Sequence, residues 1–122
     1  MNVSTPKISK YQVRTYTPKE IKVAALELTN IENNKTLNME IFIPVFKTKE
    51  NDIIEMIFYK DMEDDKEVDE SYTYLVEGPV YKIEGSIIYV SIGGMLMDID
   101  DEEMARNLSD KNFLMIGMKI IS

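Results

Sequence analysis

The chain has 122 residues, of which 44% are hydrophobic and 30% charged, a composition typical of one ordinary globular domain with its own core. Its 22 acidic and 14 basic residues give a net charge of −8, and no cluster of lysine and arginine is present to neutralise phosphates, so little autonomous binding to nucleic acid or to an anionic membrane is expected. The lack of cysteine and histidine excludes disulfides, thiolate chemistry and most zinc sites, and removes the usual acid–base catalyst near neutral pH.

The first residues, MNVSTPKISKYQVRTYT, have neither an apolar core after a basic stretch nor a small-residue cleavage pattern, so no secretory signal is expected. Nowhere do 18 consecutive apolar residues occur, and no membrane span is expected. We therefore expect an intracellular, soluble protein. These first residues are assigned no element.

Three strands are predicted in the first half of the chain from runs of apolar residues. In the second run, Met39, Ile41, Ile43 and Val45 should face one way, while Glu40 faces the other. Pro44 cannot donate a ladder hydrogen bond, which predicts an edge or a strand end there. An asparagine-rich turn is predicted at residues 30–35. The predicted strands are residues 21–28, 39–45 and 53–59, and in the last of them Ile54, Met56 and Phe58 should share one face, with Glu55 on the other.

The next segment, residues 61–70, holds seven acidic residues and one lysine, a net charge of −6 out of the −8 of the whole chain. Such a block repels itself and predicts a solvated, partly disordered acidic loop. A contact with a basic partner surface is the alternative interpretation of the same residues.

Beyond the acidic block the strand signal is strongest, because the runs are rich in tyrosine, valine and isoleucine and most are bounded by glycine or polar turns. Gly78-Pro79 is interpreted as the break between the first two runs, where Pro79 should mark a bend or bulge. Gly85-Ser86 is interpreted as a tight two-residue hairpin. Gly93-Gly94 should let the chain reverse or a backbone approach closely. A short helical turn, with acids in its first turn, is predicted at residues 101–108. The strands are residues 71–76, 80–84, 87–92, 95–99 and 113–121.

About eight strands with short connections and one helical turn favour a single domain over residues 1–122 that is mainly β. A closed or nearly closed antiparallel barrel fits better than a parallel α/β sheet, because crossovers between parallel strands need helices that this sequence does not contain. A two-sheet sandwich remains the alternative.

The search for catalytic and ligand-binding motifs is negative. An EF-hand counted from Asp98 puts Glu103 where glycine is needed and Ser109 where the bidentate glutamate is needed. No phosphate-binding glycine loop or nucleophile elbow occurs, so no catalytic residue, cofactor or metal is expected. The strand tyrosines are interpreted as half-buried sheet packing rather than as platforms for bases.

Two motifs nevertheless suggest a family. The segment SYTYLVEGPVYKIEG at residues 71–85, followed by YVSIGGMLMDI at residues 89–99, resembles the small eighth subunit common to eukaryotic nuclear RNA polymerases I, II and III. The matching patterns are G-x-V-Y-[KR]-I-E-G and Y-V-S-x-G-G-[ML]-L-M, in the family's order. A looser similarity extends from residue 20 to the end of the chain.

The resemblance implies an eight-stranded antiparallel barrel of oligonucleotide-binding type. It also implies a non-catalytic structural subunit of DNA-directed RNA polymerase, located in the nucleus, which docks on the largest subunit and supports assembly and stability in transcription. No cofactor, membrane or small-molecule substrate is expected. Larger members carry a longer insertion before the Y-V-S strand, whereas here only residues 86–88 follow Gly85. Contacts that depend on that insertion are therefore not expected.

The residues that match the second motif are the candidate core or docking positions. A different class of function stays open at this stage: a free-standing β-barrel that binds single-stranded nucleic acid through its aromatic residues, which requires salt-sensitive binding by the isolated protein. The candidate positions are Tyr89, Ser91, Gly93, Gly94, Leu96 and Met97.

Overall fold

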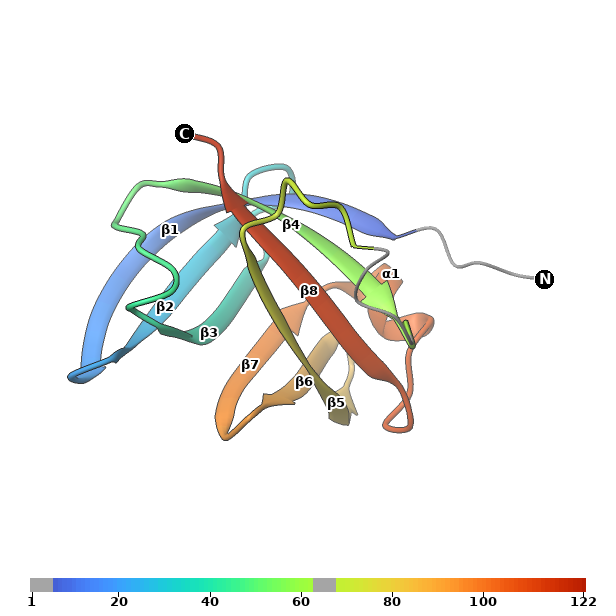
Figure 1. Ribbon diagram of the computed structural model, residues 1–122. Helices are drawn as coiled ribbons and strands as arrows, with labels where there is room; N and C mark the ends of the chain where they lie inside the picture. The colour runs from blue at the N-terminus through green and yellow to red at the C-terminus, as the bar shows by residue number, and fades with distance from the viewer. Residues whose placement is uncertain (1–5, 63–67) are drawn as a thin grey trace.

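The computed structural model describes residues 6–62 and 68–122, which form eight strands and one short helix (Figure 1). Residues 63–67, the centre of the predicted acidic loop, lie outside the described residues, so the prediction of disorder there stays a prediction. The elements are β1 (Lys7–Glu20), β2 (Val23–Asn30), β3 (Thr36–Phe42), β4 (Ile53–Lys60), β5 (Tyr74–Glu84), β6 (Ile87–Ile92), β7 (Met95–Asp100), α1 (Glu102–Arg106) and β8 (Phe113–Ile120).

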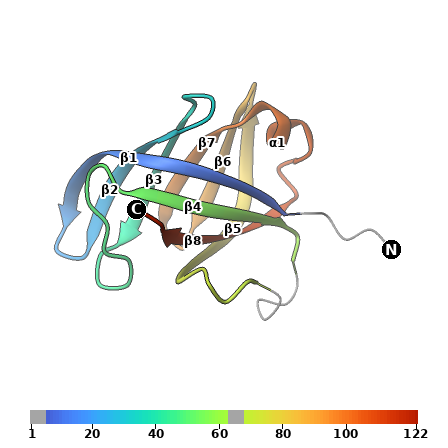
Figure 2. The same cartoon turned by 90° about the horizontal axis from the view of Figure 1, so that it is seen from above.

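The strands close into one antiparallel barrel in the order β1-β2-β3-β7-β6-β5-β8-β4, with β4 paired back to β1. This confirms the predicted barrel and excludes the sandwich. Figures 1 and 2 place α1 at one end of the barrel and the β1–β2 turn at the opposite end. The antiparallel register places the β6–β7 turn at the same end as the β1–β2 turn, because Val23 pairs with Phe42 and Met39 pairs with Met97.

The first strand was missed by the sequence prediction. β1 pairs with β4 through its first half and with β2 through its second half, and residues 21–22, predicted as strand, form the turn between β1 and β2. The apolar signal of β1 is weak, because Tyr11 and Val13 are its only fully buried side chains and charged or polar residues occupy most other positions. Hydrogen bonds to two neighbouring strands hold it in place instead.

The predicted break at Gly78-Pro79 is wrong, because β5 runs through both residues without interruption. Gly78 faces into the barrel at the point where β5 passes closely under β6. A Cβ atom on Gly78 would overlap the backbone carbonyl oxygen of Ser91. The glycine is therefore needed for a close approach of two backbones and does not end a strand. The prediction omitted β1 and divided β5 into two strands. These two errors offset each other, so the predicted number of strands was nevertheless correct.

The two predicted hairpin turns are confirmed. Gly85-Ser86 joins β5 to β6, with Glu84 paired to Ile87. Gly93-Gly94 joins β6 to β7, and both glycines have positive φ, +54° and +91°. Two successive positive φ values are the requirement of a type I′ turn, which only residues such as glycine and asparagine adopt readily.

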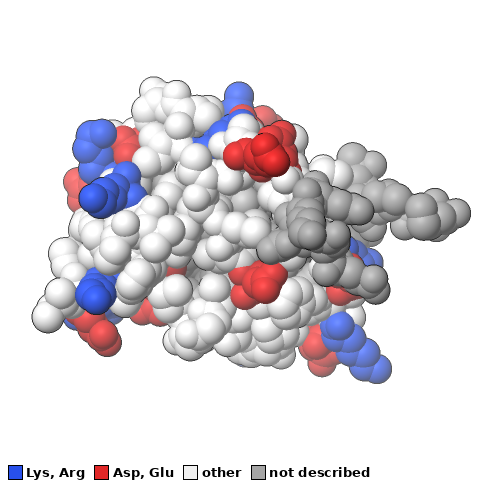
Figure 3. Space-filling view, viewed as in Figure 1, with Lys and Arg blue, Asp and Glu red and all other residues white. Residues whose placement is uncertain are grey.

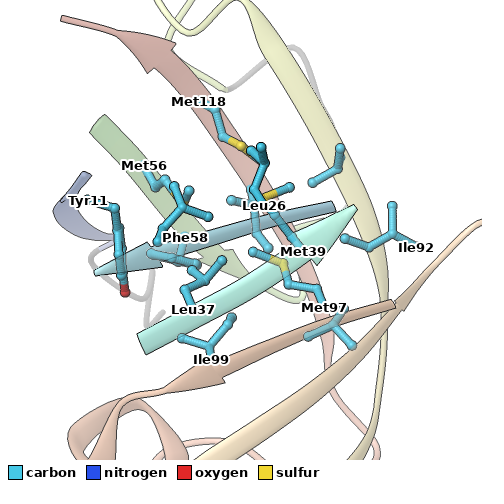
Figure 4. Packing of buried hydrophobic residues seen from close by; sticks show 14 of the residues in the cluster. Tyr11, Leu26, Leu37, Met39, Met56, Phe58, Ile92, Met97, Ile99 and Met118 are labelled. Carbon is cyan, nitrogen blue, oxygen red and sulfur yellow. The ribbon is translucent and has the colours of Figure 1, made fainter. Parts of the chain in front are cut away.

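The core fills the barrel with inward-pointing side chains from every strand, and Figure 4 shows several of them converging. In β4, Ile54 and Met56 point inward, as the predicted alternation requires. The predicted helical turn is confirmed as α1, which contributes Met104 to the core. Asp101 caps this helix, since its carboxylate accepts the backbone N–H of Met104 at 2.9 Å.

A second, smaller apolar cluster lies outside the barrel, under residues 68–72. Gly117 of β8 makes room for this segment, because a Cβ atom there would stand 3.0 Å from the Cβ of Tyr72. The Tyr72 hydroxyl donates to Glu55 at 2.6 Å, and the Lys119 ammonium lies 4.4 Å from the centre of the Tyr72 ring. The cluster consists of Ile57, Tyr59, Tyr72 and Met115, packed against Met62 and Val68.

Tyr72→Phe is expected to lower the stability at neutral pH by about 1 kcal/mol, because it removes a hydrogen bond to a charged group. The hydrogen bond from Tyr72, assisted by the charge of Lys119, lowers the pKa of Glu55 below its ordinary 4.5. A lowered pKa in the folded state stabilises the protein above pH 4.5, and this stabilisation is lost as the pH falls through the folded value. When the wild type and Tyr72→Phe are unfolded by urea at decreasing pH, the difference between their free energies of unfolding should therefore shrink. A pH-independent difference would contradict the assigned bond.

Candidate functional site

The six candidate positions all lie on the β6–β7 hairpin, but they do not form one cluster. Leu96 is on the outer surface with 57% of its side chain exposed, whereas Met97 is 1% exposed and belongs to the core. Tyr89 and Ser91 are half-buried on the outer side of β6. Gly93 and Gly94 form the turn. Of these residues, Leu96 and the turn are therefore the parts most accessible to a partner.

Tyr89 is packed by its neighbours on β5. The Lys82 ammonium lies 5.2 Å from the centre of the Tyr89 ring, and the ring of Tyr81 lies 6.1 Å away in a tilted arrangement. Aromatic and cation–π contacts of this kind stabilise neighbouring strands. The arrangement agrees with sheet packing for Tyr89, whereas the neighbouring Tyr81 is 47% exposed, against the interpretation of the strand tyrosines as half-buried.

A groove of about 360 Å³ lies beside Leu96 on the outer face of β2, β3 and β7. The register places Glu27, Asn38 and Asp98 in one row across the three strands. Asn38 donates its side-chain amide to Asp98 at 3.0 Å, and the carboxylate of Glu40 accepts the backbone N–H of Leu96 at 3.2 Å. Three carboxylates therefore line this groove, which makes it unfavourable for phosphate groups.

Exposed apolar side chains border this groove and extend over the same end of the barrel. Phe42, the last residue of β3, is 37% exposed, and two further residues in the adjoining connections, Ile21 and Val45, are 95% and 59% exposed. The sequence prediction placed both of these inside strands and put Val45 on the inward face. β3 instead ends at Phe42, before Pro44, so the alternation stops there. The strand end predicted from Pro44 is thus confirmed to within two residues, whereas the extension of the strand to Val45 is wrong.

A smaller pocket of about 270 Å³ lies at the other end of the barrel, beside α1. Lys7 stands at its rim, 2.8 Å from the carboxylate of Asp101 and 3.1 Å from that of Glu103. Burial lowers the pKa of Lys7, but its hydrogen bonds to these two carboxylates outweigh burial and raise the pKa above 10.5. Lys60 donates to the backbone carbonyl of Asn107 at 3.0 Å. Both ammonium groups are thus bound to protein groups.

The acidic residues at positions 98–103 have structural contacts. The carboxylate of Asp100 accepts the Ser86 hydroxyl at 2.7 Å, and Asp101 caps α1. Within residues 6–62 and 68–122, no three acidic side chains come together in a way that could hold a metal ion.

Figure 3 shows one face of the molecule, where acidic and basic side chains form small groups separated by uncharged surface. None of the helical structure in the described part of the chain has the length and apolar character needed to cross a bilayer. A scan against models of known protein families found no match to this chain, and a search of curated proteins found none either.

Proposed function

We propose that this chain is a non-catalytic structural subunit of a nuclear DNA-directed RNA polymerase, which docks on the largest subunit and supports assembly and stability of the enzyme in transcription. The observation that carries the proposal is the placement of the motif Y-V-S-x-G-G-[ML]-L-M. Its residues form one hairpin, with the turn and Leu96 accessible at one end of a closed eight-stranded barrel. The number of strands and the closure are those that the resemblance implies.

The surface around this hairpin has the chemistry of a protein-binding surface. Leu96 and Phe42 are large apolar side chains that are exposed at the same end of the barrel, and exposed apolar surface is typical of interaction sites. In this proposal the chain supplies no catalytic group and binds no cofactor or small-molecule substrate. The chemistry of transcription belongs to its partners.

The alternative, a free-standing barrel that binds single-stranded nucleic acid, is less well supported. Such binders combine exposed aromatic rings with a positive groove. Here the groove of the outer face is lined by Glu27, Glu40 and Asp98, and Tyr89 is packed against Lys82. We expect the isolated protein not to retard a labelled oligonucleotide, even at low salt.

Affinity purification of the tagged chain from native nuclear extract tests the proposal. The largest polymerase subunit is expected in the eluate of the wild-type protein and in reduced amount with Leu96→Ser. The matched control is Ile8→Ser on β1, which removes a side chain of similar exposure, 55%, away from the hairpin. Its eluate should equal that of the wild type. Absence of polymerase subunits from the wild-type eluate would contradict the proposed function.

A further inference from the structure

The outer face of β2, β3 and β7 changes character along the strands, from apolar at the end that carries the Gly93-Gly94 turn to acidic further in. We infer that this face binds an extended protein segment that carries a large apolar side chain and, about four residues away, an arginine or lysine. The identity of the partner rests on the proposed function, but the recognition itself follows from the groove. It is therefore testable with peptides alone.

The apolar part of this face lies on three neighbouring strands. Val23 of β2 is paired with Phe42 of β3, and both side chains point outward. Leu96 of β7 stands one row further along, level with Glu40, whose carboxylate accepts the Leu96 N–H. The backbone of Phe42 is fixed, because its N–H donates to the hydroxyl of Tyr74 at 3.2 Å. Phe42 and Leu96 thus present partly exposed apolar side chains from a rigid frame, which favours an apolar partner side chain.

The acidic part begins with Glu40, two residues from Phe42 on the same face of β3, and continues in the row beyond it. Neighbouring strands lie about 4.8 Å apart, so Glu27 and Asp98, which flank Asn38 in one row, are separated by about 10 Å. Glu40 lies two residues from Asn38 on the same face of β3. In the described part of the chain no lysine or arginine forms a salt bridge with any of the three carboxylates.

The groove has room for a cationic side chain because small residues form its floor. Ala25 and the two threonines Thr15 and Thr17 line it opposite the carboxylates and leave its volume of about 360 Å³ open. A guanidinium group suits this place, since it presents several N–H donors in a plane and can bridge two carboxylates. Binding would also reduce the repulsion between the three negative charges.

The strand register sets the spacing of the two partner side chains. Phe42 and Asn38 are four residues apart on one face of β3, a distance of about 13 Å along the strand. An extended peptide that lies along the strand presents the side chains of residues i and i+4 on one face at the same distance. A leucine over Phe42 therefore places an arginine four positions away among the carboxylates.

Fluorescence anisotropy with a labelled nine-residue peptide tests this inference. The peptide carries leucine and arginine four positions apart in a background of serine and threonine, and two control peptides replace the arginine by glutamate or the leucine by serine. The wild-type protein is expected to bind the first peptide at least about tenfold more tightly than either control, with affinity falling as salt is added.

Variants of the protein locate the binding. The triple variant Glu27→Gln, Glu40→Gln, Asp98→Asn is expected to bind the leucine–arginine peptide at least about tenfold more weakly, because exposed ion pairs each contribute modestly and three are lost. Leu96→Ser, which leaves the charges intact, is expected to bind it about threefold more weakly. Thermal unfolding of both variants should match that of the wild type, so that binding is measured on folded protein.

A matched control removes three carboxylates elsewhere: Glu32→Gln, Glu77→Gln, Glu84→Gln. This variant has the same net charge as the groove variant and should bind the peptide like the wild type. Equal weakening in the two triple variants would show general charge attraction and overturn the inference, as would a wild-type protein that does not distinguish the three peptides.

Purification from nuclear extract separates the two proposals. If the wild-type protein retains polymerase but does not distinguish the peptides, the groove inference is wrong and the proposed function stands. If the wild-type protein distinguishes the peptides but retains no polymerase, the proposed function is wrong and the groove inference stands.

Discussion

Gly78→Ala is expected to lower the free energy of unfolding by at least about 3 kcal/mol, because the added methyl group has no space that side-chain movement could provide. The Cβ atom would overlap the carbonyl oxygen of Ser91 and crowd the Cα of Ile92. These are backbone atoms of β6, so relief requires the two strands to separate. β5 is also paired with β8 on its other side, and a shift of β5 would therefore strain the closed barrel.

Urea unfolding followed by circular dichroism measures this loss, and Gly94→Ala is the matched control. Gly94 has a φ of +91°, but an added Cβ would meet no atom within 4 Å. Gly94→Ala should therefore lower the free energy of unfolding only through backbone strain, by about 1 kcal/mol. If the two variants are equally stable, β5 and β6 do not approach each other as closely as described.

The second large effect is expected for Met97→Ala, with a loss of about 2–5 kcal/mol. Met97 is 1% exposed, and it lies where β3 and β7 are joined by only three residue pairs, from Leu37 with Ile99 to Met39 with Met97. A cavity at this short junction removes packing where few backbone hydrogen bonds hold the barrel closed. The neighbouring Leu96→Ser should change the stability by less than about 0.5 kcal/mol, because Leu96 is largely exposed.

This adjacent pair separates a core role from a docking role. Unfolding by urea should be affected strongly by Met97→Ala and little by Leu96→Ser. In purification with equal amounts of folded protein, Leu96→Ser should reduce the amount of retained polymerase strongly and Met97→Ala should reduce it little. If Leu96→Ser proved the more destabilising of the two, the assignment of the faces of β7 would be incorrect.

Several elements could be predicted because their signals are local. The alternation in β4 identifies the inward positions of Ile54 and Met56, and the Gly93-Gly94 pair identifies its turn. Asp101, followed by the acidic residues Glu102 and Glu103, predicts the start of the helix. In each case the sequence pattern lies within a few residues of its physical cause. These causes are a pleated strand, a positive φ and a free N–H group.

Other features depend on contacts that no local pattern records. β1 was missed because its place in the sheet comes from two neighbouring strands and not from its own apolar residues. Ile57 and Tyr59 interrupt the alternation of β4, because residues 68–72 cover its outer face. Gly78 resembles a strand break in the sequence, and only the close approach of the β5 backbone to the β6 backbone shows why glycine is needed there.

The candidate site divides in the same way. The mainly β class, the turns and the hairpin that carries the motif could be predicted from the residues alone, since they follow from side-chain chemistry over short stretches. The position of Leu96 in solvent, beside a groove whose carboxylates come from β2, β3 and β7, depends on how the barrel closes. That groove depends on which strands pair and in which register, and the hydrogen bonds of β3 to β2 and to β7, which is far away in the sequence, set both.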